Sequence, residues 1–405
     1  MIKKIVKPKN ILILILLTSL FLRLFRLDYP EKFVFDEVYH AFTAQEYLKN
    51  NKEAWEWWTT PPPGVAFEWT HPPLAKEIMA ISMYVLKSDS GWAWRLPGVL
   101  MGTISVYLVY LLGKKLFKND TPALLAAFLF SLDGLNFVQS RTGMNDIYFI
   151  TFILSSLYLF LSKRFLLSAV FLGFSLSSKW ASVYSYIIFI PLLALNKQTK
   201  KIAIFLTVPL IVYFFTYLPF FTLDHTADQF VELHKQMWWY HTSLKASHDY
   251  ASHALSWPLN LYPVWYFVDY KDNLIANIFA SGNPLLFWLG SLSIIVTLWE
   301  AFRKKSLNLF VIVLGFFAFW LPWIVSPRIM FLYHFSPSVP FLCLSLAYQM
   351  NKHIEKPETR KITLLLILLI AISFMLLYPF LTGIHLLKNT AMFFFFTNIT
   401  KNPFQ

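Results

Sequence analysis

Residues 362–383 read ITLLLILLIAISFMLLYPFLTG, an uncharged run that decides the class of protein. A hydrocarbon core of about 30 Å needs about 20 apolar residues of helix, and this run has that length. Similar runs recur along the 405 residues, at 11–27, 93–112, 121–138, 146–161, 165–178, 181–196, 202–221, 284–301, 307–325 and 329–350. The sequence therefore predicts an all-α polytopic membrane protein with about eleven transmembrane helices.

The overall composition agrees with a membrane protein and excludes other classes. Hydrophobic residues make up 57% of the chain and charged residues 14%, against about 45–50% and about 25% in soluble proteins. The net charge of +13 does not indicate nucleic-acid binding, because the 35 Lys and Arg occur in short groups between the apolar runs. The single cysteine, Cys343, lies inside an apolar run, which excludes a disulfide scaffold.

The basic groups also predict the orientation of the chain. With a cytoplasmic N-terminus every second loop is basic, as the positive-inside rule requires. The inner loops then contain Lys114, Lys115 and Lys118; Lys163 and Arg164; Lys197, Lys200 and Lys201; Arg303, Lys304 and Lys305; and Lys352, Lys356, Arg360 and Lys361. Removing one span would break this alternation, so we expect eleven spans and an outer C-terminus. For the short runs 165–178 and 181–196, a single broken or re-entrant passage is the alternative.

Two predicted outer segments, 28–92 and 222–283, are long enough to build a site, whereas the inner loops are short. The first contains two stretches with helical apolar spacing, 37–49 and 74–87, separated by a region rich in tryptophan and proline. Tryptophan concentrates at the level of the lipid headgroups, so these helices are expected to lie along the outer interface. We therefore expect one transmembrane domain, 1–405, with its function on the outer face.

Asp36 and Glu37 begin the first outer segment. A carboxylate pair at a membrane boundary is costly unless it is solvated, paired or used in chemistry. One interpretation is a catalytic general base whose pKa is adjusted by partial burial and nearby cations. The alternative is a helix N-cap, with Asp36 as the cap and Glu37 in the first turn.

Further ionisable residues are predicted at the same outer boundary. Arg95 lies at the end of the second span, and Arg141 and Asp146 flank a short outer loop. Lys179 separates the fifth and sixth runs, and Arg328 opens the tenth. Each of these residues alone is explained as an interfacial anchor. Cations gathered beside a carboxylate at the headgroup level would instead suit a lipid-linked phosphate.

Histidines and aromatic residues supply the remaining candidates. His71 precedes Pro72 and Pro73 at a predicted loop-to-helix junction. The second outer segment contains His234, Trp238, Tyr240 and His241, which suit sugar stacking or an interfacial position. His234 and His241 are seven residues apart, so a structural zinc site is not indicated. No glycine-rich phosphate loop occurs either. The sequence therefore predicts no metal or cofactor, and a donor that is reached from within the membrane.

Nine segments together resemble the protein O-mannosyltransferases of glycosyltransferase family 39, which have the GT-C fold. They occur in the order of that family: Phe35–Val38, His71–Lys76, Ser140–Asp146, Ser177–Trp180, His234–His241, Ser256–Leu259, Pro263–Tyr266, Gly282–Pro284 and Arg328–His334. The chain is similar to the short bacterial and archaeal type, because only about a dozen residues separate His234 from the seventh span, where eukaryotic members carry a MIR domain. The resemblance implies a multi-pass protein of a prokaryotic plasma membrane.

The resemblance also implies an activity and residue roles. The enzyme would move mannose, with inversion, from polyprenyl- or dolichyl-type phosphate-mannose to Ser or Thr hydroxyls of secreted or membrane proteins. Asp36 would be the general base, with Glu37 exchanging roles with it or binding a cation or the acceptor. Binding of the donor phosphate falls to Arg95, Lys179, Arg141 and Arg328. Binding of sugar or acceptor falls to His71, Asp146, His234, Trp238, Tyr240 and His241.

Expected partners are the lipid-linked donor, membrane lipids, Ser/Thr-rich acceptor polypeptides and the secretion machinery, but not nucleic acid. The first alternative is a GT-C enzyme that moves another lipid-linked sugar, such as aminoarabinose, to a glycolipid or polymer. The second is a transporter of a lipid-linked sugar. Transporters tend to show paired half-repeats and ionisable groups at the middle of the membrane, whereas the acids here gather at one predicted face.

Overall fold

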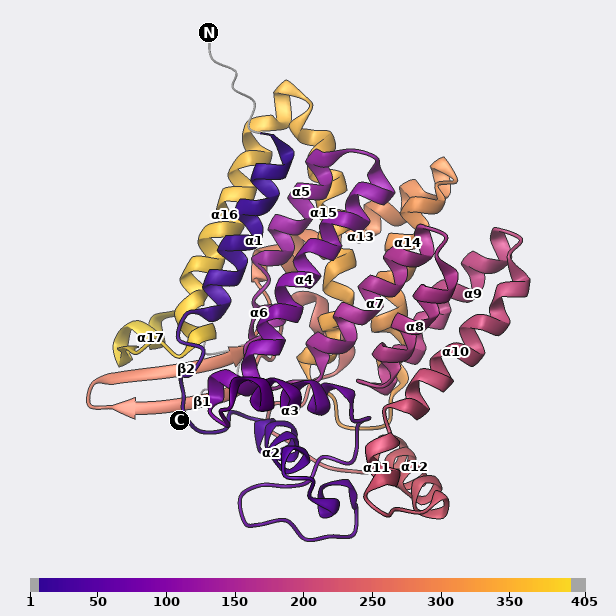
Figure 1. Cartoon of the computed structure of the whole chain (residues 1–405). Helices are drawn as coiled ribbons and strands as arrows, with labels where there is room; N and C mark the ends of the chain where they lie inside the picture. The colour runs from indigo at the N-terminus through magenta and orange to yellow at the C-terminus, as the bar shows by residue number, and fades with distance from the viewer. Residues whose placement is uncertain (1–6, 395–405) are drawn as a thin grey trace.

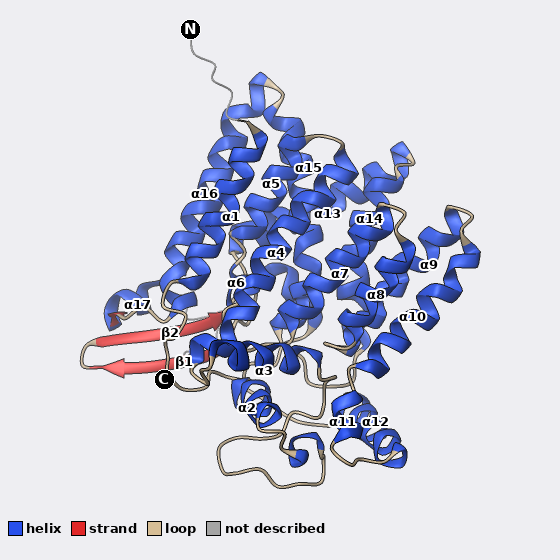
Figure 2. Cartoon of the chain, viewed as in Figure 1, coloured by secondary structure: helices blue, strands red, loops and turns tan. Residues whose placement is uncertain are grey.

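The computed structural model describes residues 7–394, and most of these residues are helical (Figure 2). The longer helices run side by side in a bundle (Figure 1). They are α1 (Pro8–Leu24), α4 (Gly91–Phe117), α5 (Asp120–Ser131), α7 (Asp146–Leu161), α8 (Phe165–Leu176), α9 (Tyr186–Leu195), α10 (Ile202–Phe215), α13 (Pro284–Lys304), α14 (Leu307–Trp320), α15 (Val339–Ile354) and α16 (Pro357–Thr382). The expected helical bundle is confirmed.

Each apolar run predicted as a span is helical over most of its length. By length and composition, five helical stretches among the described residues could cross a membrane: Gly91–Phe117, Thr199–Thr222, Pro284–Lys304, Leu307–Val325 and Pro357–Thr382. Shorter apolar helices occupy Asp120–Ser131, Asp146–Leu161, Phe165–Leu176 and Trp180–Leu195. The number of eleven crossings therefore stays a prediction.

The predicted run 121–138 is broken in two. After α5 the chain turns into the short helix α6 (Gly134–Gln139), because the Asp133 side chain accepts hydrogen bonds from the N–H groups of Leu135 and Asn136. The fifth and sixth runs are separate helical segments, and a 3-10 turn (Trp180–Ser185) leads into α9.

The two long connecting segments lie at the same end of the bundle (Figure 1). The first forms α2 (Glu37–Leu48) and α3 (Leu74–Leu86), which match the two predicted interfacial helices. The second forms α11 (Leu218–Thr222) and α12 (Ala227–Ser243). On α3 the side chains of Ile81, Tyr84 and Val85 are exposed, as expected for a helix that lies against lipid headgroups.

An antiparallel hairpin in the second segment corrects the expectation of a purely α-helical protein. Strand β1 (Val264–Lys271) pairs with β2 (Leu274–Ala280), and β2 also pairs with the short β3 (Leu386–Leu387). The strands are rich in β-branched and aromatic residues, which favour extended structure. The helix α17 (Lys388–Phe394) follows β3. Figure 1 shows the hairpin projecting sideways from the same end of the bundle as α2 and α3.

Two glycines let the segment after α6 approach α4 closely. A Cβ atom at Gly98 would lie 2.9 Å from the Ser140 carbonyl oxygen, and one at Gly102 would lie 2.5 Å from the Ser140 Cβ. Both distances are too short for a larger residue without a shift of the backbone. The contact brings the loop before α7 next to the N-terminal part of α4, where Arg95 lies. The lack of a side chain at Gly98 and Gly102 therefore helps to assemble the site described next.

Candidate active site

The pair Asp36 and Glu37 lies in the turn between α1 and α2. Phe35 adopts a left-handed conformation with φ 49°, and its ring stacks on Tyr266 of β1 with centroids 4.1 Å apart. Asp36 occupies the N-cap position of α2, but its side chain makes no capping hydrogen bond. The positions expected for a helix cap are therefore confirmed, but the Asp36 side chain does not cap the helix, and the turn places the two carboxylates in different surroundings.

Glu37 is completely buried and its carboxylate is saturated with donors. Its Oε1 accepts hydrogen bonds from Trp94 Nε1 at 3.1 Å and from the Gly143 N–H at 2.8 Å, and its Oε2 accepts from the Val34 N–H at 2.8 Å. Arg95 adds a bidentate ion pair, Nε to Oε1 at 2.8 Å and Nη2 to Oε2 at 2.7 Å. A carboxylate with five donors is a structural anchor, so an exchange of roles with Asp36 is not supported.

Arg95 has no N–H group left for a phosphate. Besides the ion pair, its Nη1 donates to the carbonyl oxygens of Leu27 at 3.0 Å and Pro30 at 2.9 Å, and its Nη2 donates to that of Lys32 at 3.1 Å. These contacts use all five donors of a guanidinium group. The expectation that Arg95 binds the donor phosphate is therefore corrected: Arg95 closes the turn that carries the acids.

Arg141 is engaged in a similar way, near the end of α1. Its Nη1 donates to the carbonyl oxygens of Leu22 at 3.0 Å and Arg23 at 2.7 Å, and its Nη2 to that of Arg26 at 3.3 Å. The last carbonyl groups of a helix lack partners within the helix, and a cation there satisfies them. Arg141 therefore holds the end of α1 with three of its five N–H groups, and its expected role at the donor phosphate stays a prediction.

Lys179 and Asp146 form a second ion pair, and the charges of both residues act on the pKa of Asp36. The Lys179 Nζ lies 2.8 Å from Oδ1 and 3.0 Å from Oδ2 of Asp146, which begins α7. The same Nζ lies 5.7 Å from the centroid of the Tyr333 ring, a cation–π distance. One of the three N–H groups of Lys179 has no partner among the described residues. Unlike Arg95, Lys179 keeps a donor for a ligand.

The Asp36 carboxylate is half-buried and makes no hydrogen bond or ion pair with the part of the chain that the structure describes. Burial raises its pKa from 3.8 to about 6. The charges of His40 and Lys179 lower this pKa, and those of Glu68 and Asp146 raise it. A carboxylate with a pKa near 6 is ionised at neutral pH and is a stronger base than an ordinary aspartate. Asp36 is thus the carboxylate of the pair that remains available for proton transfer.

Glu68, which the sequence analysis did not single out, organises a buried polar cluster beside Asp36. The Lys76 Nζ lies 2.7 Å from its Oε2, and the Nδ1 atoms of His71 and His40 lie 3.1 and 3.6 Å from its carboxylate oxygens. Burial alone would raise the pKa of Glu68, but Lys76 and His71 hold it well below its usual range. The spacing of Glu68, His71 and Lys76 within one loop-to-helix junction is the signal that could have revealed this cluster.

The contacts of His71 assign its proton. Burial lowers the pKa of His71 far below its usual value, so the ring is neutral. Its Nδ1 faces the ionised Glu68, which can only accept, so Nδ1 carries the hydrogen. The lone pair is then on Nε2, which has no hydrogen-bond partner among the described residues. His71 therefore presents a free hydrogen-bond acceptor, and its expected role in binding sugar or acceptor stays a prediction.

His241 and Arg328 join α12 to this cluster. The His241 Nε2 donates to the Thr70 carbonyl oxygen at 2.7 Å, and its Nδ1 accepts from Arg328 Nη1. Burial, and then the charge of Arg328, lower the pKa of His241 to about 4. The Arg328 guanidinium also lies 5.5 Å from the centroid of the Tyr240 ring. Arg328 is half-buried, and its remaining N–H groups have no partner among the described residues, so it can still bind an anion.

His234 and Trp238 lie apart from this arrangement. His234 donates through Nδ1 to the Phe230 carbonyl oxygen at 2.8 Å and accepts through Nε2 from the Tyr213 hydroxyl at 2.9 Å, so both ring nitrogens are used within the protein. The expected sugar-binding role of His234 is not supported by these contacts. Trp238 is 64% exposed on α12, and its indole N–H has no hydrogen-bond partner among the described residues.

Among the described residues, no group of three or more His, Cys, Asp and Glu side chains is arranged to hold a metal ion. The site offers a half-buried base, Asp36, whose pKa is lowered by the charge of Lys179, and a second cation, Arg328, that is held by His241. Both cations keep N–H groups without a partner among the described residues. This combination suits transfer of a group from a phosphate to a hydroxyl, because the base accepts the hydroxyl proton and the cations stabilise the departing phosphate.

Comparison with known proteins agrees with this chemistry. Residues 13–246, more than half of the chain, match the family described as dolichyl-phosphate-mannose-protein mannosyltransferase. Residues 226–394 match the C-terminal four-helix membrane region of protein O-mannosyltransferases. The polyprenol-phosphate-mannose–protein mannosyltransferase of Mycobacterium tuberculosis is 23% identical, and the match covers 88% of this chain and 84% of that protein.

Solved structures show the same fold. The protein O-mannosyltransferase Pmt1–Pmt2 complex of S. cerevisiae, bound to the sugar donor, matches with a TM-score of 0.81 and 14% identity over 98% of this chain and 93% of that chain. ArnT from Cupriavidus metallidurans, bound to undecaprenyl phosphate, matches with a TM-score of 0.63 and 12% identity over 90% of this chain and 70% of that chain. The GT-C fold and the resemblance found in the sequence are confirmed: the chain belongs to the dolichyl-phosphate-mannose-protein mannosyltransferase family.

Proposed function

We propose that this chain transfers mannose from a polyprenyl-phosphate-mannose donor to Ser or Thr hydroxyl groups of polypeptides. The observation that carries the proposal is the half-buried Asp36 carboxylate, which makes no hydrogen bond or ion pair with the described residues and whose pKa is lowered by the charge of Lys179. Family membership and the named activity of the mycobacterial relative support the choice of donor and acceptor.

The chemical step is a displacement at the anomeric carbon of mannose. The acceptor hydroxyl oxygen attacks this carbon from the face opposite the phosphate, and its proton passes to Asp36. The bond between the anomeric carbon and the phosphate oxygen breaks, and polyprenyl phosphate leaves with the electron pair. The configuration is inverted. Because a hydroxyl group is far less acidic than Asp36, proton transfer accompanies bond formation and contributes roughly 10²–10⁴-fold to the rate.

Stabilisation of the leaving phosphate is assigned to Lys179 and Arg328, in place of Arg95. Both assigned residues keep N–H groups without an internal partner, whereas Arg95 has none. Asp146 holds Lys179 through two hydrogen bonds and thereby positions its ammonium group. The step as written uses no metal or cofactor.

Acceptor binding is assigned to the side of the site formed by the first loop and α12. His71 offers a hydrogen-bond acceptor, and Tyr240 and Trp238 offer aromatic surface. From the distribution of basic loops, we place this end of the bundle on the outer face of a prokaryotic plasma membrane, with the N-terminus in the cytoplasm. Secreted Ser/Thr-rich polypeptides would reach it there as they leave the secretion machinery.

The experiment that tests the proposal uses the purified chain in detergent or vesicles. Radiolabelled polyprenyl-phosphate-mannose and a Ser/Thr-rich peptide are supplied, and mannose on the peptide is measured for the native chain and for Asp36→Asn. We expect turnover by Asp36→Asn to fall by roughly 10²–10⁴-fold while donor binding is retained. Mannose transfer by this variant at a near-native rate would disprove the assignment of Asp36.

A matched control is Asp228→Asn, the same change at an exposed position on α12 at the same end of the bundle, which should leave turnover unchanged. A parallel reaction with polyprenyl-phosphate-linked aminoarabinose and a glycolipid acceptor tests the alternative sugar. Transfer of aminoarabinose in place of mannose would replace the proposed substrate but keep the assigned base.

A further inference from the structure

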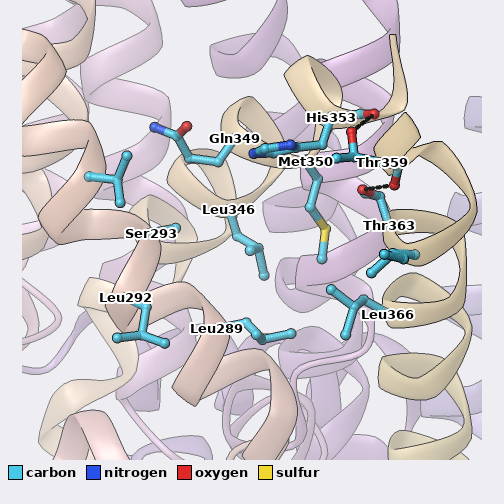
Figure 3. Close-up of a pocket in the computed structure, with 12 residues that line it drawn as sticks. Leu289, Leu292, Ser293, Leu346, Gln349, Met350, His353, Thr359, Thr363 and Leu366 are labelled. Atoms are coloured by element: carbon cyan, nitrogen blue, oxygen red, sulfur yellow. Dashed lines mark hydrogen bonds between the residues drawn. The ribbon is translucent and has the colours of Figure 1, made fainter. Parts of the chain in front are cut away.

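A groove opens at the end of the bundle opposite Asp36, between α13, α15 and α16. Its cavity volume is about 390 Å³, within the ~300–1,000 Å³ that ligand pockets usually have. Figure 3 shows the side chains that line it. The groove is separate from the carboxylates and cations of the candidate active site, which lie at the end formed by α2 and β1 (Figure 1).

The lining changes from apolar to polar along the groove. Leu289, Leu292 and Leu366 line the part that lies toward the middle of the bundle. Gln349 and His353 line the part near the connection between α15 and α16, where Thr359 and Thr363 also lie (Figure 3). A groove with a hydrocarbon-like interior and a polar mouth at the end of a helix bundle has the polarity of a lipid molecule that stands in one leaflet.

The mouth of the groove is also basic. Residues 300–305 and 352–361 contain seven Lys and Arg side chains and three Glu. Glu300 is paired with both Lys304 and Lys352, so it neutralises charge that is already inside the cluster. Among the described residues, no ion pair is formed by Lys305, Lys356, Arg360 or Lys361, and the last three are exposed. Arg360 and Lys361 stand between Thr359 and Ile362 of α16, which line the groove.

The Arg360 side chain is hydrogen-bonded to Ile354, the residue after His353, which lines the groove. Its Nε donates to the Ile354 carbonyl oxygen at 2.8 Å, which fixes the side chain against the end of α15 and leaves both Nη groups unpartnered among the described residues. The Nη edge of a guanidinium group binds phosphate oxygens in a bidentate manner. Basic pockets between transmembrane helices are a recurrent way to bind anionic headgroups.

We propose that this groove binds an anionic phospholipid from the leaflet opposite the active site. One acyl chain lies between α13 and α16 against Leu289, Leu292 and Leu366. The phosphate of the headgroup lies at Arg360, with Lys356 and Lys361 nearby. The lipid would join α16, whose outward surface is otherwise exposed to the membrane, to the rest of the bundle.

The test measures lipid binding to the purified full chain. The chain is delipidated in detergent and incubated with phosphatidylglycerol or with phosphatidylcholine of the same acyl chains, and bound lipid is counted by native mass spectrometry. We expect one phosphatidylglycerol to be retained and phosphatidylcholine to be lost. Equal retention of the two lipids would overturn the proposal, and so would a dimer mass in place of bound lipid.

Two pairs of variants locate the site. Leu292→Trp fills the groove and should abolish retention, whereas Ile295→Trp, an exposed position on the same helix outside the lining, should not. Arg360→Gln with Lys361→Gln should lower retention by about tenfold. The control Lys197→Gln with Lys200→Gln makes the same charge change in another predicted inner loop and should have no effect. Retention unchanged by Leu292→Trp would overturn the placement of the lipid.

Discussion

Asp36 and Glu37 are adjacent carboxylates at the same turn, yet their surroundings are opposite. Glu37 is fully buried and receives five hydrogen bonds, two of them from Arg95. Asp36 is half-buried and receives none from the described part of the chain. The difference separates two tasks that a single carboxylate could not perform together: one residue holds the turn in place, and its neighbour remains free to accept a proton.

The two carboxylates also differ in their effect on stability. Removing the counter-charge of a buried ion pair typically costs 3–5 kcal/mol. The ionised Asp36 carboxylate has the opposite effect and destabilises the folded chain, because burial raises its pKa from 3.8 to about 6. At about 1.4 kcal/mol for each pKa unit, the ionised Asp36 lowers the stability of the folded chain by on the order of 3 kcal/mol at neutral pH. While Asp36 is protonated at acidic pH, the folded chain does not have this loss. The loss of stability develops as the pH rises through about 6.

The largest expected effect concerns Glu37, the carboxylate that is fully paired within the protein. Glu37→Gln should lower the free energy of unfolding by about 3–5 kcal/mol, because Arg95 is left buried without a carboxylate. Unfolding of the purified variants in detergent, followed by tryptophan fluorescence, measures this loss. Asp36→Asn is the control and should keep or raise the stability at pH 7. Equal destabilisation by the two variants would contradict the separation of tasks.

The next largest effect concerns Lys179, which keeps an N–H group free for a ligand. Lys179→Met should lower kcat by roughly 10²–10³-fold, the cost of losing one group that stabilises developing charge. Single-turnover transfer of labelled mannose measures it. Because Asp146 would lose its partner, the double variant Lys179→Met with Asp146→Asn serves as the control for folding. Recovery of activity in the double variant would show that Lys179 acts only on Asp146 and not on the phosphate.

A smaller effect concerns pH. The active form of Asp36 is the carboxylate, so kcat/KM should fall about tenfold for each pH unit below about 6 and level off above it. Measurement of kcat/KM between pH 4.5 and 8 shows this fall on the acidic side of the profile. The residual activity of Asp36→Asn should show no such fall near pH 6. A fall that persists in this variant would assign the titration to another group.

The smallest effect concerns the acceptor. If Trp238 contacts the polypeptide, Trp238→Ala should raise the KM for the peptide by roughly 2–10-fold, with the KM for the donor and the stability unchanged. Peptide titrations at saturating donor measure it. Trp239→Ala, the neighbouring exposed tryptophan, is the control. An unchanged peptide KM would leave Trp238 as a membrane contact.

Several residues show why the site could be predicted only in part. Asp36, Asp146 and Lys179 were expected together because each follows or precedes a predicted span at the same boundary, and the structure brings them together. It could not be predicted that all N–H groups of Arg95 have partners. Its acceptors are three backbone carbonyl groups and the Glu37 carboxylate, and their directions depend on the turn at 27–37. The hairpin was missed because strands that are apolar on both faces lack the alternation that identifies them.

The sequence by itself determined where helices form and which end of the bundle carries the chemistry. Hydrocarbon accepts only long apolar helices, and charges are forced to the boundaries, so the order of apolar runs and charged groups along the chain is enough for that conclusion. The tertiary structure decided which of the charged residues are free. Hydrogen-bond donors and acceptors are few and directional, and partners such as Glu37 and Gly143 are distant in the sequence. Only the folded chain therefore shows that Glu37 and Arg95 satisfy one another while Asp36, Lys179 and Arg328 retain capacity for a ligand.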